Sequence, residues 1–171
     1  MSKEISRESQ MWKVPMIYHE IPGFGKIETD HLVLDYNGTL ALDGELLPGV
    51  ADALRKLSSQ LQLHIVTADT FGVAASRLAG IPCRLSVLST QAQDEAKAAY
   101  VRSLGADKTA CIGNGRNDKR MLKEARLGIA VLGGEGVAYE TLAAADVVVT
   151  DIRAALELFM HPLRLVATLR S

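Results

Sequence analysis

Short apolar runs alternate with helical patterns along most of this sequence, and that alternation limits the folds open to the chain. The apolar runs are typical of buried strands, and between them apolar residues recur with helical spacing. The predicted strands cover residues 31–35, 63–69, 83–89, 109–115, 128–134 and 145–151. Strands that alternate with helices of about ten residues form a parallel sheet covered on both faces. We therefore expect an α/β fold with three α/β/α layers and a mainly parallel sheet.

Turn and cap residues mark the ends of the predicted helices. Pro48 opens one helix, Gly80 and Gly105 end two others, and Pro162 bends or breaks the last. Asn117 or Asp118 is expected to cap the fourth. The predicted helices cover residues 48–61, 70–80, 94–105, 117–128, 136–145 and 153–170.

The segment before the first of these strands predicts a flexible tail and an edge hairpin. Residues 1–12 form the tail, and residues 14–22 and 26–35 form the hairpin, with a turn at Gly23 and Gly25. Residues 13–171 are then expected to form one domain.

Composition excludes several classes of function. A net charge of −1, from 19 basic and 20 acidic side chains, provides no general attraction to nucleic acid or an anionic membrane. The polar start MSKEISRESQ lacks a signal peptide, and no run is long enough to span a membrane, so we expect a cytoplasmic protein. Cys83 and Cys111 lie in apolar runs and are interpreted as buried small residues. The four histidines show no metal-ligand spacing.

Polar residues follow the predicted strands, where ligands bind in parallel α/β sheets. Asp35 ends a buried strand in LVLDYNGTLALDGELL, and a carboxylate there costs desolvation energy unless it has partners. The turn after it, Asn37-Gly38-Thr39, can aim backbone N–H groups at an anion. An ordinary strand-end Asp is about equally compatible with this cluster alone. Asp43-Gly44 is a hairpin signal, so residues 40–47 are expected to form a small flap over the site.

Three further clusters have a functional and an ordinary interpretation. Thr67 can donate a hydrogen bond to a phosphate, or satisfy its own backbone, while Asp69 is expected to cap the next helix. Lys97 can neutralise phosphate charge, or lie on a solvated helix face. In IGNGRND two glycines allow close approach to a ligand, and Asp118 is an oxygen donor suited to Mg²⁺. The four clusters occur in the order DYNGT, Thr67, Lys97 and GNGRND. Because this ordered set is hard to obtain by chance, the functional interpretation of the clusters is favoured.

This ordered set resembles the haloacid dehalogenase (HAD) superfamily, with its pattern DxDGT, a strand-end Ser or Thr, a Lys and GDxxND. Within it, the sequence is most similar to the phosphorylation domain of P-type ATPases, which carries DKTGT, TGD, a helical K-x-x-x-V-x-x-L and GDGxND. The matching stretches here are DYNGT, TAD, Lys97 through Leu104, and GNGRND, and the likeness covers about residues 31–151. It resembles the soluble P-type ATPase-like group, which lacks the membrane part. The resemblance implies a Rossmannoid fold.

The resemblance also implies the role of each residue. Asp35 would be the nucleophile that forms an aspartyl-phosphate. The catalytic set would be Asp35, Asn37, Thr67 and Lys97. The Mg²⁺ site would be formed by Asp35, the Asn37 carbonyl, Asn114 and Asp118. The phosphoryl oxygens would be held by Gly38, Thr67, Ala68 and Lys97. Asn117 and Arg116 would be secondary, and Arg116 either touches a substrate anion or lies solvated on the rim.

Two departures from the family pattern weaken the implied chemistry. Asn37 replaces the usual acid–base Asp and cannot shuttle a proton, a help worth roughly 10²–10⁴-fold. Asn114 replaces the first Asp of GDGxND, so one negative charge is lost and weaker metal binding is expected.

The stretches from Asp35 to Thr67 and from Thr67 to Lys97 leave no room for a cap domain. The site is therefore expected to be open to a small or macromolecular phosphate, or covered by a neighbouring subunit.

Three functions remain open on the sequence. The first is a slow Mg²⁺-dependent phosphohydrolase or phosphotransferase acting on a phosphorylated small molecule or macromolecule. The second is a catalytically impaired module that binds phosphate or a partner, which Asn37 and Asn114 favour. The third is a structural, oligomer-building protein, in which the C-terminal FMHPLRLVATLR packs on a partner subunit instead of its own sheet.

Overall fold

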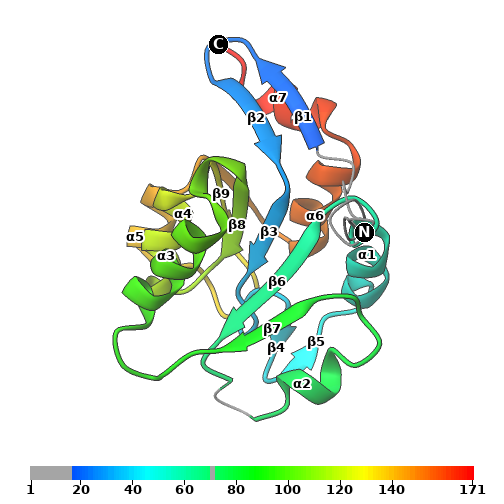
Figure 1. Cartoon of the computed structure of the whole chain (residues 1–171), viewed down its shortest axis with the longest axis vertical. Helices are drawn as coiled ribbons and strands as arrows, with labels where there is room; N and C mark the ends of the chain where they lie inside the picture. Colours follow the sequence, from blue (N-terminus) through cyan, green and yellow to red (C-terminus); the bar gives the residue numbers. More distant parts are fainter. Residues whose placement is uncertain (1–16, 70–71) are drawn as a thin grey trace, which may run out of the picture.

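A parallel sheet forms the centre of the protein (Figure 1). The computed structural model describes residues 17–69 and 72–171, so the predicted tail at 1–12 lies outside the described residues, as do residues 14–16 of the hairpin. The six strands are ordered β10-β9-β8-β3-β6-β7, and all neighbours run parallel. Their bounds are β3 His31–Leu34, β6 Gln62–Thr67, β7 Arg84–Val87, β8 Thr109–Gly113, β9 Leu127–Val131 and β10 Val147–Val149. The expected parallel α/β sheet is confirmed.

Alternating side chains of the central strands fill two separate cores. On β3, Leu32 and Leu34 belong to the larger core, whereas Val33 belongs to the smaller one. Every residue of β8 and β9 is buried, as expected for strands covered by helices on both faces. The sheet therefore lies between two helical layers, as predicted.

Each face of the sheet is covered by a different set of helices (Figure 1). The larger core includes buried residues of α1, α2, α6 and α7, and the smaller core includes those of α3 and α4. The helices span α1 Val50–Leu57, α2 Ala74–Arg77, α3 Gln93–Leu104, α4 Lys119–Glu124, α5 Tyr139–Ala144, α6 Ile152–Met160 and α7 Leu163–Leu169. The 3₁₀ turns η2 Ala106–Lys108 and η3 Arg116–Asp118 precede β8 and α4.

Two small hairpins accompany the main sheet. β1 Ile17–Ile21 and β2 Gly25–Thr29 pair antiparallel, and β2 is separated from β3 by Asp30 alone. The predicted strand 26–35 is thus two strands, and the hairpin forms its own sheet. The second pair, β4 Ala41–Leu42 and β5 Glu45–Leu46, turns at Asp43 and Gly44 with φ of 52° and 83°. This confirms the hairpin predicted at Asp43-Gly44, because positive φ at both positions is the type I′ geometry.

Four predicted helices are shorter than expected: those at residues 48–61, 70–80, 117–128 and 136–145 are reduced to α1, α2, α4 and α5. α2 makes only one turn, because Gly72 and Gly80 at its two sides have φ of 67° and 75°, a conformation that helices do not continue through. Residues 70–71 of that prediction lie outside the described residues. α1 begins after Gly49, which has φ of 83°, and ends at Leu57.

The C-terminal helices cover the chain's own sheet. Pro162 separates α6 from α7, as predicted, and buried residues of α6 such as Leu156 and Phe159 belong to the larger core. This arrangement favours packing within the chain over packing of this segment on a partner. Among residues 17–69 and 72–171, no helix is long and apolar enough to cross a membrane.

Candidate active site

Three polar residues meet at the carboxyl edge of the sheet. Asp35 directly follows β3, and its N–H donates to the Ile112 carbonyl of β8 at 3.0 Å. In the strand register Leu34 pairs with Ile65 of β6, so Thr67 at the end of β6 lies beside the start of the Asp35 turn. Asn114 follows β8 directly. The expectation that these residues lie at the same sheet edge is confirmed.

A tight turn holds the backbone after Asp35. The Tyr36 carbonyl accepts from the N–H groups of Leu40 and Ala41, and the Tyr36 hydroxyl donates to the Gly44 carbonyl at 2.9 Å. Gly38 has φ of 78°, and its N–H donates to the Ala41 carbonyl at 2.8 Å. That N–H is therefore engaged within the turn, so any contact of Gly38 with phosphate would have to use another atom.

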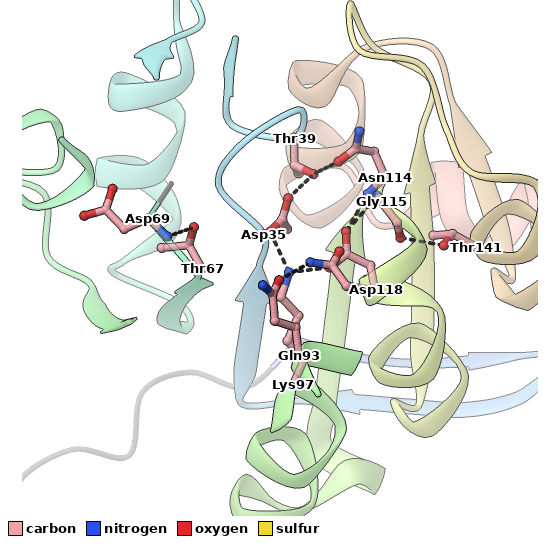
Figure 2. A network of polar contacts seen from close by, with 11 residues as sticks. Asp35, Thr39, Thr67, Asp69, Gln93, Lys97, Asn114, Gly115, Asp118 and Thr141 are labelled. Atoms are coloured by element: carbon pink, nitrogen blue, oxygen red, sulfur yellow. Dashed lines mark hydrogen bonds and ion pairs between the residues drawn. The ribbon is translucent and has the colours of Figure 1, made fainter. Parts of the chain in front are cut away.

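A buried ion cluster lies at the centre of the site (Figure 2). Lys97 Nζ lies 2.6 Å from Asp35 Oδ1 and 2.6 Å from Asp118 Oδ1. The three side chains are 1%, 9% and 0% exposed for Lys97, Asp35 and Asp118 respectively. Lys97 is thus not a solvated helix-face lysine, because α3 directs it under the strand ends.

Asp118 fixes both the lysine and the loop after β8. Its Oδ2 accepts from the N–H groups of Asn114 and Gly115 at 3.0 and 2.9 Å. The prediction that Asp118 caps α4 is therefore wrong. Its carboxylate accepts from backbone N–H groups that precede it in the chain, and no side chain caps the first turn of α4. Gly113 gives this carboxylate room, since a Cβ there would lie 2.6 Å from Asp118 Cγ.

The cluster carries more negative than positive charge. Burial, and then the neighbouring Asp118 carboxylate, raise the pKa of Asp35 to about 7, although Lys97 opposes both effects. Burial alone lowers the pKa of Lys97, but the two carboxylates outweigh it and raise this pKa. Two carboxylates against one ammonium leave an excess buried charge, which a proton or a further cation relieves.

Thr67 lies beside this cluster without a hydrogen bond to it (Figure 2). Its hydroxyl oxygen accepts from the Asp69 N–H at 3.0 Å. Accepting this bond leaves the hydroxyl hydrogen available to donate. Asp69, with φ of 47°, accepts from the N–H groups of Val73 and Ala74 at 3.1 Å, so its carboxylate binds the start of α2, although the N-cap residue is Val73 and not Asp69 as predicted. Ala68 lies between the two, half-buried.

Asn114 joins the nucleophile turn to the loop after β9. Thr39 Oγ1 donates to Asn114 Oδ1 at 3.1 Å and lies 3.3 Å from Asp35 Oδ2. Asn114 Nδ2 donates to the Gly136 carbonyl at 3.0 Å, and the Ala138 N–H donates to the Asn114 carbonyl at 2.9 Å. The DYNGT motif assigns Thr39 no role of its own, and its place between two motifs is a long-range contact that no local pattern indicates.

The donor set suits a hard cation. No group of three or more His, Cys, Asp or Glu side chains forms a ready-made metal site within residues 17–69 and 72–171. The candidate ligands are all oxygens, the atoms Mg²⁺ prefers, and this ion keeps several waters. Asn37 Oδ1 is buried without a hydrogen-bond partner in the described chain, and the neighbouring cluster has unbalanced negative charge. These two observations fit a divalent cation beside Asp35.

The secondary residues lie on the rim. Asn117 donates to Gln93 Oε1 at 2.6 Å, which ties the loop after β8 to the start of α3. Arg116 is exposed and pairs with Glu140 at 3.1 Å, and Lys119 pairs with the same carboxylate. A surface pocket of about 480 Å³ opens here, lined by Thr90, Ala92, Gln93, Asp94, Arg116, Asn117 and Lys119.

Structural comparisons agree on the fold. A cobalt-bound deoxy-D-mannose-octulosonate 8-phosphate phosphatase from Haemophilus influenzae aligns with a TM-score of 0.64 and 15% identity, covering 78% of this chain and 88% of that one. The 3-deoxy-D-manno-octulosonate 8-phosphate phosphatase from Moraxella catarrhalis, solved with magnesium, phosphate and KDO, aligns with a TM-score of 0.64 and 20% identity, covering 83% and 94%. The chain therefore has the HAD-like Rossmannoid fold of these capless phosphatases.

Sequence comparisons identify relatives of unassigned function. No protein-family model matches the chain. The uncharacterized protein MJ0073 of Methanocaldococcus jannaschii is 49% identical over 63 residues, which are 37% of this chain and 68% of that protein. The uncharacterized protein MJ0072 of the same organism is 41% identical over 39 residues, 23% of this chain and 89% of that protein. Because the match covers 68% of MJ0073 at 49% identity, this chain belongs to the same family as MJ0073.

Proposed function

We propose that this protein is a Mg²⁺-dependent phosphohydrolase or phosphotransferase that works through an aspartyl-phosphate on Asp35. The observation that carries the proposal is the buried contact of Lys97 with both Asp35 and Asp118 at the carboxyl edge of the sheet. A buried lysine between two carboxylates is costly to assemble, because each charge must lose its water. Buried charged groups with shifted pKa values are typical of functional sites.

Each residue then has a defined task in phosphoryl transfer. Asp35 in its anionic form attacks phosphorus, the bond from phosphorus to the leaving oxygen breaks, and that oxygen departs with its electron pair. Thr67 donates its free hydroxyl hydrogen to a phosphoryl oxygen, while Lys97 offsets the negative charge. Such reactions depend on position and charge neutralisation more than on covalent help. Water attack on the acyl phosphate then releases phosphate and restores Asp35.

Asn37 sets the expected speed. An amide can neither give a proton to the leaving group nor take one from water, so both half-reactions lack general acid–base help at this position. We expect slow turnover, with the phosphorylated state persisting. This behaviour agrees with the likeness of the motifs to P-type ATPase phosphorylation domains, which make a phospho-enzyme.

Mg²⁺ would be held by Asp35, the Asn37 carbonyl, Asn114 and Asp118. When bound, the ion offsets the charge of both carboxylate and phosphate and lets the two anions meet. Asp118 already accepts three hydrogen bonds, so its main contribution to the ion is negative charge.

The lack of a cap domain in the described residues and the names of similar structures support a phosphorylated substrate. No cap domain is inserted in the described residues, so a small phosphorylated substrate or a phosphate on a macromolecule can reach Asp35. The similar structures include phosphatases whose names specify a phosphorylated sugar acid. A neighbouring subunit of a homo-oligomer would be a second way to cover the site.

The test is Mg²⁺-dependent phosphate release from acetyl phosphate and p-nitrophenyl phosphate, with intact mass recorded on the same samples. Asp35→Asn is the matched control, because it keeps the shape of the side chain and removes the nucleophile. We expect release that requires Mg²⁺ and is lost in the variant, or a stable mass gain of one phosphate. Neither release nor adduct, in a folded protein that binds Mg²⁺, would reject the catalytic proposal.

The alternative is a module that binds phosphate or a partner without turnover. The observation in its favour is that Asn114, at a usual acidic position, uses its amide to hold neighbouring loops. In that case phosphate mimics such as vanadate or beryllium fluoride bind to the wild type, and no phospho-enzyme forms.

A further inference from the structure

The loop after β9 is fixed by contacts with Asn114, with the end of β10 and within the loop itself. Gly136 is held at both ends of its peptide, since its N–H donates to the Gly133 carbonyl at 2.9 Å and its carbonyl accepts from Asn114. At its start, the Leu132 N–H donates to the Val149 carbonyl at 2.8 Å, and at its end Ala138 binds Asn114. These contacts define the course of the loop, residues 132–138.

Glu135 projects from this loop onto Gly38. A Cβ on Gly38 would lie 2.6 Å from Glu135 Oε2, 2.4 Å from Asn114 Nδ2 and 2.8 Å from Asn114 Oδ1. The space left by the absent Cβ is therefore shared by the Glu135 carboxylate and the Asn114 amide. Asn114 in turn contacts Thr39, which contacts Asp35. Glu135 thus reaches the side of the site on which the first Asp of GDGxND would lie.

No cation of the described chain accounts for this placement. Most exposed acidic residues on helices next to the site, such as Glu95 and Glu140, pair with arginine or lysine. Glu135 forms no salt bridge and no hydrogen bond with residues 17–69 and 72–171. The excess negative charge of the cluster repels the exposed Glu135 carboxylate, and a further cation between them would turn this repulsion into attraction.

The Asn114 amide explains why the negative charge lies on Glu135 instead of on residue 114. Its Nδ2 donates to the Gly136 carbonyl, which an aspartate could not do because its oxygens only accept. The amide therefore holds the loop in place, and the loop carries the carboxylate. One residue supplies the contact and another supplies the charge.

From this geometry we infer that Glu135 supplies the acidic ligand that Asn114 lacks, as an outer-sphere carboxylate that binds a water of the divalent cation at Asp35. The inference rests on the proposed function in taking that cation to be Mg²⁺. An outer-sphere role fits, because Mg²⁺ retains several waters and Glu135 is exposed to solvent. Losing such a partner typically weakens metal affinity by about 10- to 100-fold.

The test is isothermal titration calorimetry of the full chain with MgCl₂, repeated by Mn²⁺ electron paramagnetic resonance. Glu135→Gln removes the charge and keeps the size, and we expect the dissociation constant to rise by about tenfold or more. Glu20→Gln is the matched control, since it makes the same change on β1, at the opposite end of the sheet, and should leave the constant unchanged.

A second variant separates charge from loop packing. Asn114→Asp combined with Glu135→Gln returns a carboxylate to this side, and we expect it to recover part of the lost affinity. Equal affinities for Glu135→Gln and Glu20→Gln would overturn the inference, and so would a wild type that binds neither ion at millimolar concentration. If Mg²⁺ binding depends on Glu135 but no phosphate is released and no adduct forms, the catalytic proposal is rejected and the inference on Glu135 stands.

Discussion

Lys97 is the residue on which the stability and the chemistry of the site both depend. Its ammonium is buried between Asp35 and Asp118, and within residues 17–69 and 72–171 it is the only cation that pairs with either carboxylate. Removing one member of a buried charge set leaves the others without a partner, which costs about 3–5 kcal/mol. Lys97→Met keeps the length and apolar stem of the side chain. We expect it to lower the free energy of unfolding by about that amount, measured by urea denaturation in Mg²⁺-free buffer.

The control for this prediction is Lys123→Met, the same substitution at an exposed position of α4. Surface changes of this kind usually stay within about 0.5 kcal/mol. A loss below about 1 kcal/mol for Lys97→Met would mean that the two carboxylates share a proton or water instead of depending on the lysine.

Sequence motifs predicted the positions of these residues better than their contacts. Asp35, Thr67, Lys97 and Asp118 were each predicted as site residues, because strand ends and glycine-rich turns are local patterns. The contacts of Asn114 with Thr39 and Gly136 join segments far apart in the chain, which no local pattern reveals. Glu135 was missed for the same reason, since its approach to Gly38 depends on how two loops pack.

At the scale of elements, β3, β6 and α3 are joined by a chain of three polar side chains, of which His64 is buried and the other two are half-buried. His64 contacts His31 at 3.1 Å and the Tyr100 hydroxyl at 2.9 Å. Burial, followed by the charges of His31 and Arg84, lowers the pKa of His64 from 6.5 to about 4. Between these values the unfolded chain binds a proton that the folded chain rejects. The free energy of unfolding therefore falls as the pH drops through this window.

His64→Gln tests this linkage, because an amide can still donate and accept but does not titrate. The wild type should lose up to about 3 kcal/mol more than the variant between pH 7 and pH 4, measured by urea unfolding at each pH. His161→Gln, at an exposed position, should follow the wild-type profile. Parallel profiles for wild type and His64→Gln would show that folding leaves the pKa of His64 unchanged.

The start of α6 offers a second prediction for a single element. Asp151 Oδ1 accepts from the Arg153 N–H at 2.7 Å, a helix N-cap contact. Asp151→Ala should lower the free energy of unfolding by about 1 kcal/mol, whereas Asp151→Asn keeps a capping oxygen and should lose less. Thermal or urea unfolding measures both. Equal losses would assign the effect to the ion pair with Arg153 instead of the cap.

Sequence patterns predicted the strands of the main sheet well and the ends of the helices poorly, because helices end where the backbone turns. Each of the six main strands was expected, since short apolar runs bounded by polar residues are typical of buried strands. The single turn of α2 was not, because a positive φ at Gly72 is a backbone property that composition alone does not fix. The separation of β2 from β3 at Asp30 was missed because the apolar pattern runs on through it.

The molecule as a whole contains a six-stranded sheet with an attached hairpin, and the sequence predicted the first but not how the second is held. The strand order follows from parallel pairing of distant segments, which motifs do not specify. The β1–β2 hairpin lies next to α7, beyond the start of β3 (Figure 1), and it has contacts on two sides. On one side α7 packs on β1, and the Ser171 N–H donates to the Pro22 carbonyl at 3.1 Å. On the other side the hairpin contacts Arg126, which directly precedes β9.

Arg126 binds the hairpin through two hydrogen bonds and a ring contact. Its guanidinium donates to the Lys26 carbonyl at 2.8 Å and the Phe24 carbonyl at 3.0 Å, and it lies 4.6 Å from the centre of the Phe24 ring. Arg126→Ala removes all three contacts, and we expect faster hydrogen exchange in peptides covering residues 17–29, with β8 and β9 still protected. Arg126→Lys keeps the charge but loses the forked geometry, so its exchange should be intermediate. If exchange rose equally in the hairpin and in the central strands, the hairpin would be part of one cooperative unit with the sheet, because local opening changes protection only where the contacts are lost.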